Sequence, residues 1–289
     1  MIIETLKSEL KKMGIEAEDF ENLQSKDGIY VYRICLGGKT AVIKYFEKDE
    51  YKREILCYDK LRNSNIDTIP ILNQTDRCIV MEDMDSSEKY RLGIKDGLHD
   101  EEVIKSLAKW YKDFHSVKLT DWEKENFYCE AKLITMENIE KIKQFNSDNE
   151  CFKLLEIYGD KLFNQYKNYQ ICLNYNDFYY TNFIVAKDKT SAFMFDYNLL
   201  GIGYRYSDIR NVCSALSDEM KEVFLREYGG FDVKEKVTDE WMSPLIDLIY
   251  ASQRDSFPDW AEESLEKLRN GSISSTMMFS LKTIRDNRI

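Results

Sequence analysis

The sequence predicts an α+β protein of two lobes: an N-terminal lobe made of an antiparallel sheet with one helix, and a mainly helical C-terminal lobe. A chain of 289 residues is longer than one compact core usually needs, which favours two lobes. The first part of the chain holds β-rich runs separated by turn residues, whereas from Asp100 onward apolar residues recur at helical spacing. We place the boundary in the acidic segment that begins at Glu82, which gives lobes of residues 1–83 and 84–289.

The elements of the N-terminal lobe follow from its apolar pattern. Residues 3–13 have apolar side chains at helical spacing and are followed by Gly14, which predicts an opening helix. Two β-rich runs are joined by Gly37-Gly38, the pattern of a β-hairpin. The helix of this lobe is expected between Glu50 and Arg62, where Tyr51, Ile55, Tyr58 and Leu61 form an apolar stripe. The predicted strands are 28–36, 40–46, 70–72 and 78–81.

The C-terminal lobe is predicted to be helical with a β-rich interruption. Leu107, Trp110, Tyr111 and Phe114 occupy one helical face. Further helices are expected at 132–145 and 152–166, and short strands at 170–173, 183–185 and 192–195.

Composition limits the classes of partner. Acidic residues outnumber basic ones 52 to 41, for a formal net charge of -11, and this balance disfavours a nucleic-acid partner. No stretch is apolar for long enough to predict a membrane span, and the interleaved charges after Met1 do not form the apolar core of a signal peptide. The sequence leaves the oligomeric state open.

Cysteine and histidine usage points to a cytoplasmic protein without a zinc centre. The seven cysteines are an odd number and form no Cys-x-x-Cys pair, which indicates reduced thiols. The two histidines, His99 and His115, are too few for a histidine-rich metal site or a histidine-based triad.

A predicted hairpin brings together two oxygen-bearing side chains. Asn182 and Asp196 each lie seven residues from Lys189, in the turn that joins residues 183–185 to 192–195. Antiparallel pairing about that turn is expected to set Asn182 opposite Asp196 at the open end. An amide oxygen beside a carboxylate suits Mg²⁺, so the two residues are candidate metal ligands.

Asp177 is the candidate general base. It lies five residues before Asn182, in the loop after the 170–173 strand, close to the predicted metal without having to bind it. Phosphoryl transfer needs this separation, because metal ions neutralise phosphate oxygens while another carboxylate orients the attacking hydroxyl.

Lys44 and Glu54 are predicted to form an ion pair. Lys44 ends the apolar run Ala41-Val42-Ile43, so its ammonium is expected to lie partly buried and to need a counter-charge. Glu54 falls on the apolar stripe of the 50–62 helix and is the expected partner. The pair would hold Lys44 toward the α- and β-phosphates of a nucleotide. The structural alternatives are a strand-end lysine and a surface glutamate.

These residues resemble the protein-kinase-like superfamily, and more closely its small-molecule branch, the aminoglycoside phosphotransferases and the choline/ethanolamine kinases. The resemblance covers residues 28–211. It implies a protein-kinase-like fold, ATP and Mg²⁺ as cofactors, Lys44 and Glu54 at the nucleotide, and the Asp-x-x-x-x-Asn loop from Asp177 to Asn182 as base and metal ligand, with Asp196 as second ligand. Residues 79–84 resemble the hinge that reads adenine through its backbone, which assigns Glu82 and Met84 to the nucleotide site.

Other motifs refine the resemblance. Asp208 resembles the family's buried aspartate that supports the catalytic loop through backbone N–H groups. Tyr175-Asn176-Asp177 and Tyr204-Arg205 followed by Asp208-Ile209 are closer to the choline/ethanolamine pattern than to the antibiotic-modifying one. Three departures stand beside these matches: Tyr175 replaces the usual histidine, Tyr197-Asn198 follows the metal-binding aspartate in place of Phe-Gly, and the segment at Ser25 is a glycine-poor phosphate loop.

The predicted reaction is transfer of the γ-phosphate of ATP to a hydroxyl of a small molecule, an alcohol, amino alcohol or amino sugar, by an aminoglycoside phosphotransferase-like enzyme. The alternatives are a choline/ethanolamine kinase-like enzyme and a pseudokinase that binds nucleotide without turnover. A protein kinase is disfavoured, because no activation segment ending in Ala-Pro-Glu follows Asp196. Asp255, Trp260 and Glu263 are candidate substrate contacts, although a solvated helix start at Asp259 accounts for the same segment.

Overall fold

The computed structural model describes residues 2–286, with side chains described up to residue 282. The chain forms two compact units, each assembled from segments that are distant in sequence. Unit 1 comprises residues 1–117, 177–200 and 213–228, and unit 2 comprises 118–176, 201–212 and 229–289. These units are defined by internal packing. The predicted lobes, 1–83 for nucleotide binding and 84–289 for catalysis and substrate binding, divide the chain by function, and that division stays a prediction.

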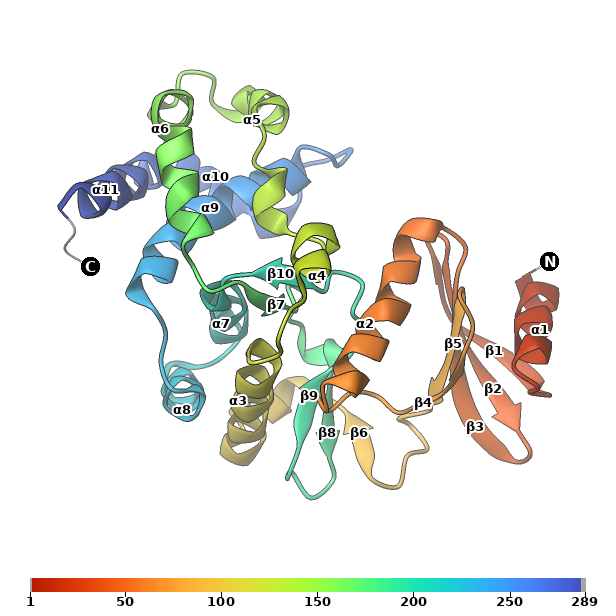
Figure 1. The fold of residues 1–289 in the computed structure, drawn as a ribbon. Coiled ribbons are helices and arrows are strands. Elements are labelled where there is room, and N and C mark those ends of the chain that lie inside the picture. Colours follow the sequence, from red (N-terminus) through yellow and green to blue (C-terminus); the bar gives the residue numbers. More distant parts are fainter. Residues whose placement is uncertain (1, 287–289) are drawn as a thin grey trace. The chain divides into compact units, whose positions relative to one another are not determined.

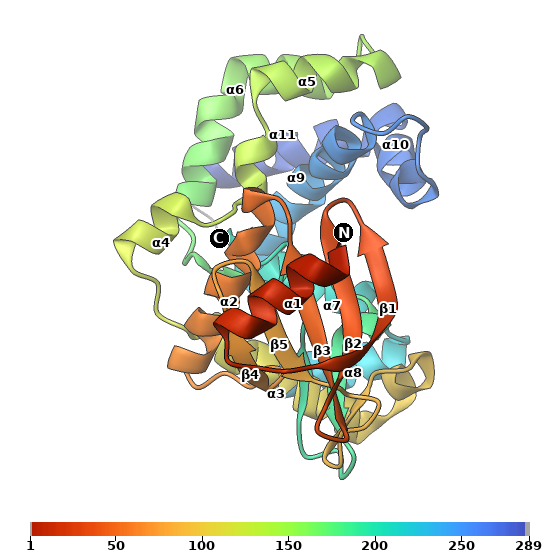
Figure 2. The same cartoon turned by 90° about the vertical axis from the view of Figure 1, so that its right-hand side faces the viewer.

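Unit 1 begins with a five-stranded antiparallel sheet of order β1-β2-β3-β5-β4. The predicted hairpin at Gly37-Gly38 is confirmed, because β2 and β3 pair in continuous register from Ile29 opposite Phe46 to Leu36 opposite Lys39. Two helices, α1 (Ile2–Lys12) and α2 (Arg53–Asn63), lie on opposite faces of the sheet (Figures 1 and 2). The strands are β1 (Glu18–Lys26), β2 (Ile29–Leu36), β3 (Lys39–Phe46), β4 (Ile71–Gln74) and β5 (Cys78–Glu82).

The alternation of β3 decides which side chains meet which helix. Ala41 and Ile43 pack with Leu6 and Leu10 of α1 in one buried cluster. Because successive residues of a strand point to opposite faces, Lys44 faces the other side, where α2 lies. The sheet therefore separates an apolar face from a face that carries a buried cation.

The rest of unit 1 combines a small sheet with two packed helices. β6 (Tyr90–Leu92), β8 (Phe183–Ala186) and β9 (Ala192–Met194) form an antiparallel sheet of order β6-β8-β9. α3 (Glu101–His115) packs against α8 (Asp218–Tyr228), and Tyr111 of α3 meets Phe224 of α8 edge to face. All four residues of the predicted helical face on α3 are buried, which confirms it.

Unit 2 is mainly helical. Its core includes Trp241, Leu245 and Leu248 of α9 and is shared with α6 and α11. The pair β7 (Cys172–Asn174) and β10 (Gly201–Gly203) forms a two-stranded sheet. The helices are α4 (Asp121–Asn126), α5 (Met136–Ile142), α6 (Glu150–Lys167), α7 (Arg205–Ser214, which starts in unit 2), α9 (Val233–Ala251), α10 (Glu262–Arg269) and α11 (Ser272–Asp286). Single 3-10 turns occur at Asp49–Lys52, Lys95–His99, Glu130–Leu133, Lys143–Phe145, Tyr180–Asn182 and Asp259–Ala261.

The structure differs from the predicted elements in several places, and the strands β1, β6 and β10 are among the elements that the sequence did not predict. The strand β1 is not anticipated by the sequence, since its residues are almost all exposed and polar and show no alternation. In the glycine-poor segment at Ser25, residues 25 and 26 end β1, and Asp27 and Gly28, both with positive φ, form the two-residue turn into β2. The helix expected at 132–145 is divided into a 3-10 turn, α5 and a second 3-10 turn.

Across residues 2–286, every helix is too short or too polar to cross a membrane.

Candidate active site

Lys44 and Glu54 form the ion pair that the sequence predicts. Lys44 Nζ lies 2.9 Å and 2.7 Å from the two carboxylate oxygens of Glu54. Both side chains are buried, with 8% of Lys44 and none of Glu54 exposed. Burial alone would lower the pKa of Lys44, but the carboxylates of Glu54 and Asp196 outweigh it and raise that pKa above its ordinary value. Lys44 is therefore a fixed cation.

Asp196 is the second carboxylate on Lys44. Its Oδ1 lies 2.7 Å from Lys44 Nζ, so the ammonium bridges α2 and the segment after β9. Asp196 has φ of 61°, in the left-handed region that costs a residue with a side chain roughly 1 kcal/mol or more. One third of its side chain is exposed. The Asp196 carboxylate thus pairs with the buried Lys44 and still has surface that solvent can reach.

Asp177 and Asn182 lie in the same group of residues. The Asn182 amide donates to a carboxylate oxygen of Asp177 at 3.2 Å. Burial and the nearby Asp196 carboxylate raise the pKa of Asp177 to about 6, against the opposing effects of the Asn182 hydrogen bond and Lys44. All five predicted residues at the phosphates and the metal, Lys44, Glu54, Asp177, Asn182 and Asp196, come together in unit 1.

The pairing of the β8–β9 hairpin differs from the prediction by one residue. Phe183 is opposite Met194, and the Phe195 N–H donates to the Asn182 carbonyl at 3.0 Å. Asn182 is therefore opposite Phe195, and the expected direct pairing of Asn182 with Asp196 is wrong. The positive φ of Asp196 bends the chain just beyond this last pair.

The carboxylate and amide oxygens of Asp196 and Asn182 are the donor types that Mg²⁺ prefers, so these two residues would hold such an ion. Among the residues that the structure describes, no three His, Cys, Asp or Glu side chains form a group that could hold a metal ion by themselves. Mg²⁺ in nucleotide sites uses one or two protein ligands and takes the rest from phosphates and water. The Asn182 amide nitrogen donates to Asp177, so the amide oxygen is the atom with which Asn182 would bind a metal, and the ligand roles of Asn182 and Asp196 stay predictions.

The predicted hinge residues end β5. The Glu82 N–H donates to the Pro70 carbonyl at 3.0 Å, so this N–H is already used within the protein. Met84 is buried two residues later. Between them, the buried Asp83 accepts from Arg33 Nε at 2.7 Å, and Arg33 also contacts Glu21 and Asp85. Arg33 thereby connects β1, β2 and the hinge.

Asp208 makes the contacts expected of a supporting aspartate. Its two oxygens accept from the backbone N–H of Tyr175 at 2.8 Å and of Asn176 at 2.9 Å. Asp208 is 1% exposed, and the two residues it binds come directly before Asp177 in the chain. Because Asp208 binds the backbone N–H of Tyr175, the replacement of histidine by this buried tyrosine leaves the support in place.

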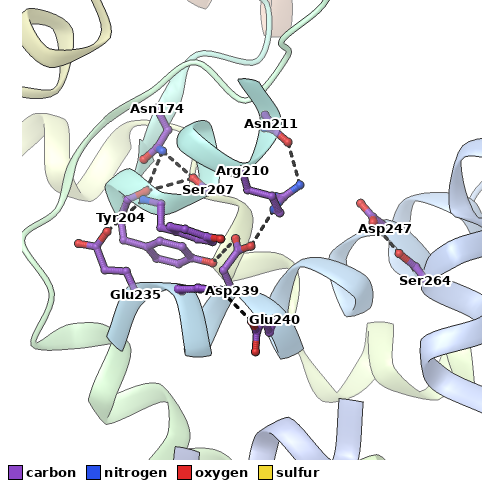
Figure 3. Close-up of polar contacts among 12 residues, drawn as sticks. Asn174, Tyr204, Ser207, Arg210, Asn211, Glu235, Asp239, Glu240, Asp247 and Ser264 are labelled. Atoms are coloured by element: carbon purple, nitrogen blue, oxygen red, sulfur yellow. Dashed lines mark hydrogen bonds and ion pairs between the residues drawn. The ribbon is translucent and has the colours of Figure 1, made fainter. Parts of the chain in front are cut away.

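A polar network holds the helix that carries Asp208 (Figure 3). Arg210 Nε donates to Asp239 of α9 at 2.7 Å, and the Tyr204 hydroxyl donates to the same carboxylate at 3.0 Å. At the start of α7, Glu235 accepts from the Tyr206 N–H at 3.0 Å. A carboxylate at a helix N-terminus also complements the helix dipole. Asp208 therefore lies on a firmly anchored helix.

The three predicted substrate contacts lie in unit 2. Asp255 is exposed, Trp260 is half exposed, and the exposed Glu263 pairs with Lys267 one turn along α10. Asp259 is exposed and begins a 3-10 turn that runs directly into α10, so the predicted solvated helix start is confirmed, although no side-chain cap bond is formed at either N-terminus. The substrate roles of the three residues stay predictions.

The sequence did not predict the residues that support the segments carrying Glu54 and Asp196. Tyr197 follows Asp196 directly, is fully buried and bonds with Thr68, 129 positions away. Arg53 Nε donates to the Asn198 carbonyl at 2.8 Å. The one available signal was position, since Arg53 directly precedes Glu54, and Tyr197 and Asn198 directly follow Asp196.

Comparison with known proteins identifies the fold. No protein-family model and no curated sequence matches the chain. Among solved structures, choline kinase LicA from Streptococcus pneumoniae is similar with a TM-score of 0.64 at 14% identity, over 94% of this chain and 99% of that one. Macrolide 2'-phosphotransferase MphH from Brachybacterium faecium gives 0.60 at 12% identity, over 92% and 97%. Plasmodium vivax ethanolamine kinase gives 0.59 at 16% identity, over 89% and 83%.

These structures agree with the predicted α+β fold class and with the predicted resemblance. At such identities they show the fold and leave the substrate open. The chain has the protein-kinase-like fold found in small-molecule phosphotransferases.

Proposed function

We propose that this protein is an ATP-dependent phosphotransferase that moves the γ-phosphate of ATP to a hydroxyl of a small molecule. The observation that carries the proposal is Lys44, a buried cation held between Glu54 and Asp196, with the carboxylate of Asp177 in the same group. Similar folds in choline, ethanolamine and macrolide kinases support it.

Each residue has a separate role in the proposed reaction. Lys44, oriented by Glu54, binds the α- and β-phosphates, and the hinge around Glu82 and Met84 takes the adenine through its backbone. Asn182 and Asp196 would hold Mg²⁺, which supplies positive charge at the phosphate oxygens.

Asp177 acts on the acceptor. Its carboxylate accepts the proton of the substrate hydroxyl while that oxygen forms a bond to the γ-phosphorus and the bond to the ADP oxygen breaks. A pKa of about 6 leaves Asp177 ionised at neutral pH. It also makes the carboxylate a stronger base toward the hydroxyl proton than an ordinary aspartate. Asp208, through Tyr175 and Asn176, fixes the loop that presents Asp177.

The acceptor class follows less directly. We propose an amino alcohol, an amino sugar or a related metabolite, because the similar solved structures include kinases of choline, ethanolamine and spectinomycin. Asp255, Trp260 and Glu263 are the proposed contacts, since acidic and aromatic side chains bind amines. The protein is proposed to act in the cytoplasm.

The test is a coupled assay of ADP release with choline, ethanolamine, aminoglycosides, sugars and amino-acid alcohols as acceptors. At least one acceptor is expected to give turnover that Asp177→Asn lowers by a factor of 100 or more, with nucleotide affinity within about twofold. Asp113→Asn, which changes an exposed aspartate of α3, is the matched control and should have no effect. Normal turnover by Asp177→Asn would refute the assignment of Asp177 as the general base. Nucleotide binding without turnover of any acceptor would instead identify a pseudokinase.

A further inference from the structure

The tyrosine after Asp196 is buried to an unusual degree for a residue beside an accessible carboxylate. Tyr197 has no exposed surface, and its ring meets the ring of Tyr58 edge to face with centroids 4.8 Å apart. Tyr58 lies on α2 one turn after Glu54, the residue that holds Lys44. The two tyrosines therefore pack α2 against the segment that carries Asp196.

The Tyr197 hydroxyl makes two directed contacts. It donates to the Met194 carbonyl at 2.5 Å, and it lies 2.9 Å from the Thr68 hydroxyl. A phenol has a single proton. Because that proton goes to Met194, the Thr68 hydroxyl must be the donor to the Tyr197 oxygen. The result is a chain of hydrogen bonds from Thr68 through Tyr197 to Met194.

This chain encloses Asp196. Met194 is the last residue of β9 and lies two positions before Asp196, while Tyr197 lies one position after it. The Tyr197 side chain thus folds back and closes the bend in which Asp196 has its positive φ. Thr68 comes from the connection between α2 and β4, and so ties the bend to the element that follows α2.

A bend of this kind needs outside support. The left-handed conformation is unfavourable for aspartate by roughly 1 kcal/mol or more, and it persists only where neighbours over-determine it. The same conformation accompanies the 2.7 Å contact of Asp196 with Lys44. Packing of the ring alone would be satisfied by phenylalanine. The hydroxyl adds the directional contacts.

We propose that the Tyr197 hydroxyl, held by Thr68, is a positioning group that fixes the Asp196 carboxylate for the metal and for Lys44. The inference rests on the proposed function. Tyr197 touches neither nucleotide nor acceptor in this proposal and acts only through Asp196. A lost hydroxyl should therefore change metal-dependent steps more than it changes folding.

The experiment compares Tyr197→Phe, Thr68→Val and the double variant in the full chain. Calorimetry measures the affinity for ADP with and without Mg²⁺, and steady-state assays measure kcat and the acceptor KM. Tyr197→Phe is expected to reduce the gain in ADP affinity that Mg²⁺ provides by at least fivefold. Metal-free ADP affinity and acceptor KM should change less than twofold, and kcat should fall at least tenfold.

Variants of Thr68 test whether its hydroxyl acts on Asp196 through the Tyr197 hydroxyl. Thr68→Val should show a smaller loss of the same kind, and Thr68→Ser, which keeps the hydroxyl, should restore wild-type behaviour. The double variant should be no worse than Tyr197→Phe, because Thr68 acts through the hydroxyl that is already absent. Full additivity of the two changes would overturn the proposal.

Tyr228→Phe is the matched control. Tyr228 is also buried in unit 1, and its hydroxyl bonds with His115 of α3 at 2.8 Å. It should lower the melting temperature about as much as Tyr197→Phe and leave the Mg²⁺ effect unchanged. If both variants behave alike, the Tyr197 hydroxyl is only structural and the inference is wrong.

The outcomes separate the two proposals. A wild-type protein that binds Mg²⁺ and ADP but is insensitive to Tyr197→Phe overturns the positioning role alone. A wild-type protein with no metal-dependent nucleotide affinity overturns the proposed function and this inference together.

Discussion

Lys44 Nζ lies 2.7 Å from a carboxylate oxygen of Glu54, and the glutamate has no exposed surface. A buried charge that loses its partner is expensive, since breaking such a pair from one side costs about 3–5 kcal/mol. The ion pair therefore stabilises the contact between the sheet and α2, in addition to its proposed role in the site.

The first prediction concerns this pair. Lys44→Met should lower the free energy of unfolding by about 3 kcal/mol, because Glu54 then stays buried without a cation. Adding Glu54→Gln should recover at least half of the loss. Urea unfolding measures both, with Lys112→Met, at an exposed position of α3, as the control. Equal stability of Lys44→Met and wild type would contradict the prediction.

The second prediction concerns Asp208. Asp208→Asn replaces one of two accepting oxygens with a donor that faces a backbone N–H, which should cost about 2 kcal/mol of stability. Because the affected backbone directly precedes Asp177, kcat should fall tenfold or more with little change in nucleotide affinity. Thermal unfolding and ADP release measure the two effects. Asp160→Asn, at an exposed site of α6, should match wild type.

The third prediction concerns Glu130 and pH. Burial, with smaller contributions from Asp247 and Asp239, raises the pKa of Glu130 to about 8, against the opposing effect of Arg210. The folded state therefore holds this proton where the unfolded state, with an ordinary pKa of about 4.5, has lost it. The contribution of Glu130 to stability is largest below pH 4.5 and is lost as pH rises toward 8.

Glu130→Gln mimics the protonated form and tests this sign. The variant should melt about 2–4 °C above wild type at pH 8.5, which corresponds to about 1 kcal/mol, and near wild type at pH 5. The difference should grow steadily with pH. Glu125→Gln, at an exposed position of α4, should show no such trend. A constant difference at all pH values would mean that the Glu130 proton is not involved.

The fourth prediction concerns the predicted hinge. Arg33→Met removes the guanidinium that pairs with the buried Asp83, so the segment after β5 should lose order. Nucleotide affinity is expected to fall about three- to tenfold, while the effect of Asp177→Asn on kcat stays the same. Calorimetry with ADP measures the change. Arg91→Met, in the edge strand β6 of the small sheet, is the comparison. A larger loss in Arg91→Met would remove the special role of Arg33.

Much of the site was predictable because each signal was local. The turn at Gly37-Gly38 set the β2–β3 register, and that register placed Lys44 on the α2 face. Glu54 stood out as a carboxylate within an apolar stripe. The family pattern supplied the order of Asp177, Asn182 and Asp196 along the chain.

The rest depended on three-dimensional facts with no local signal. The β8–β9 pairing is shifted by one residue because the turn contains the four residues 187–190 and is centred between Asp188 and Lys189, whereas the prediction centred it on Lys189. The hydroxyl contact of Tyr197 involves Thr68, which is remote in sequence and unremarkable in composition. A helix anchored by a buried Arg210–Asp239 pair is likewise invisible before α7 and α9 are placed together.

The strand β1 has one further effect on how the protein behaves in a crowded solution. It is an edge strand of the five-stranded sheet. Its charged side chains and its two register shifts make it a poor partner for a strand of another molecule. The polarity that concealed this strand from prediction thereby discourages edge-to-edge aggregation of neighbouring molecules.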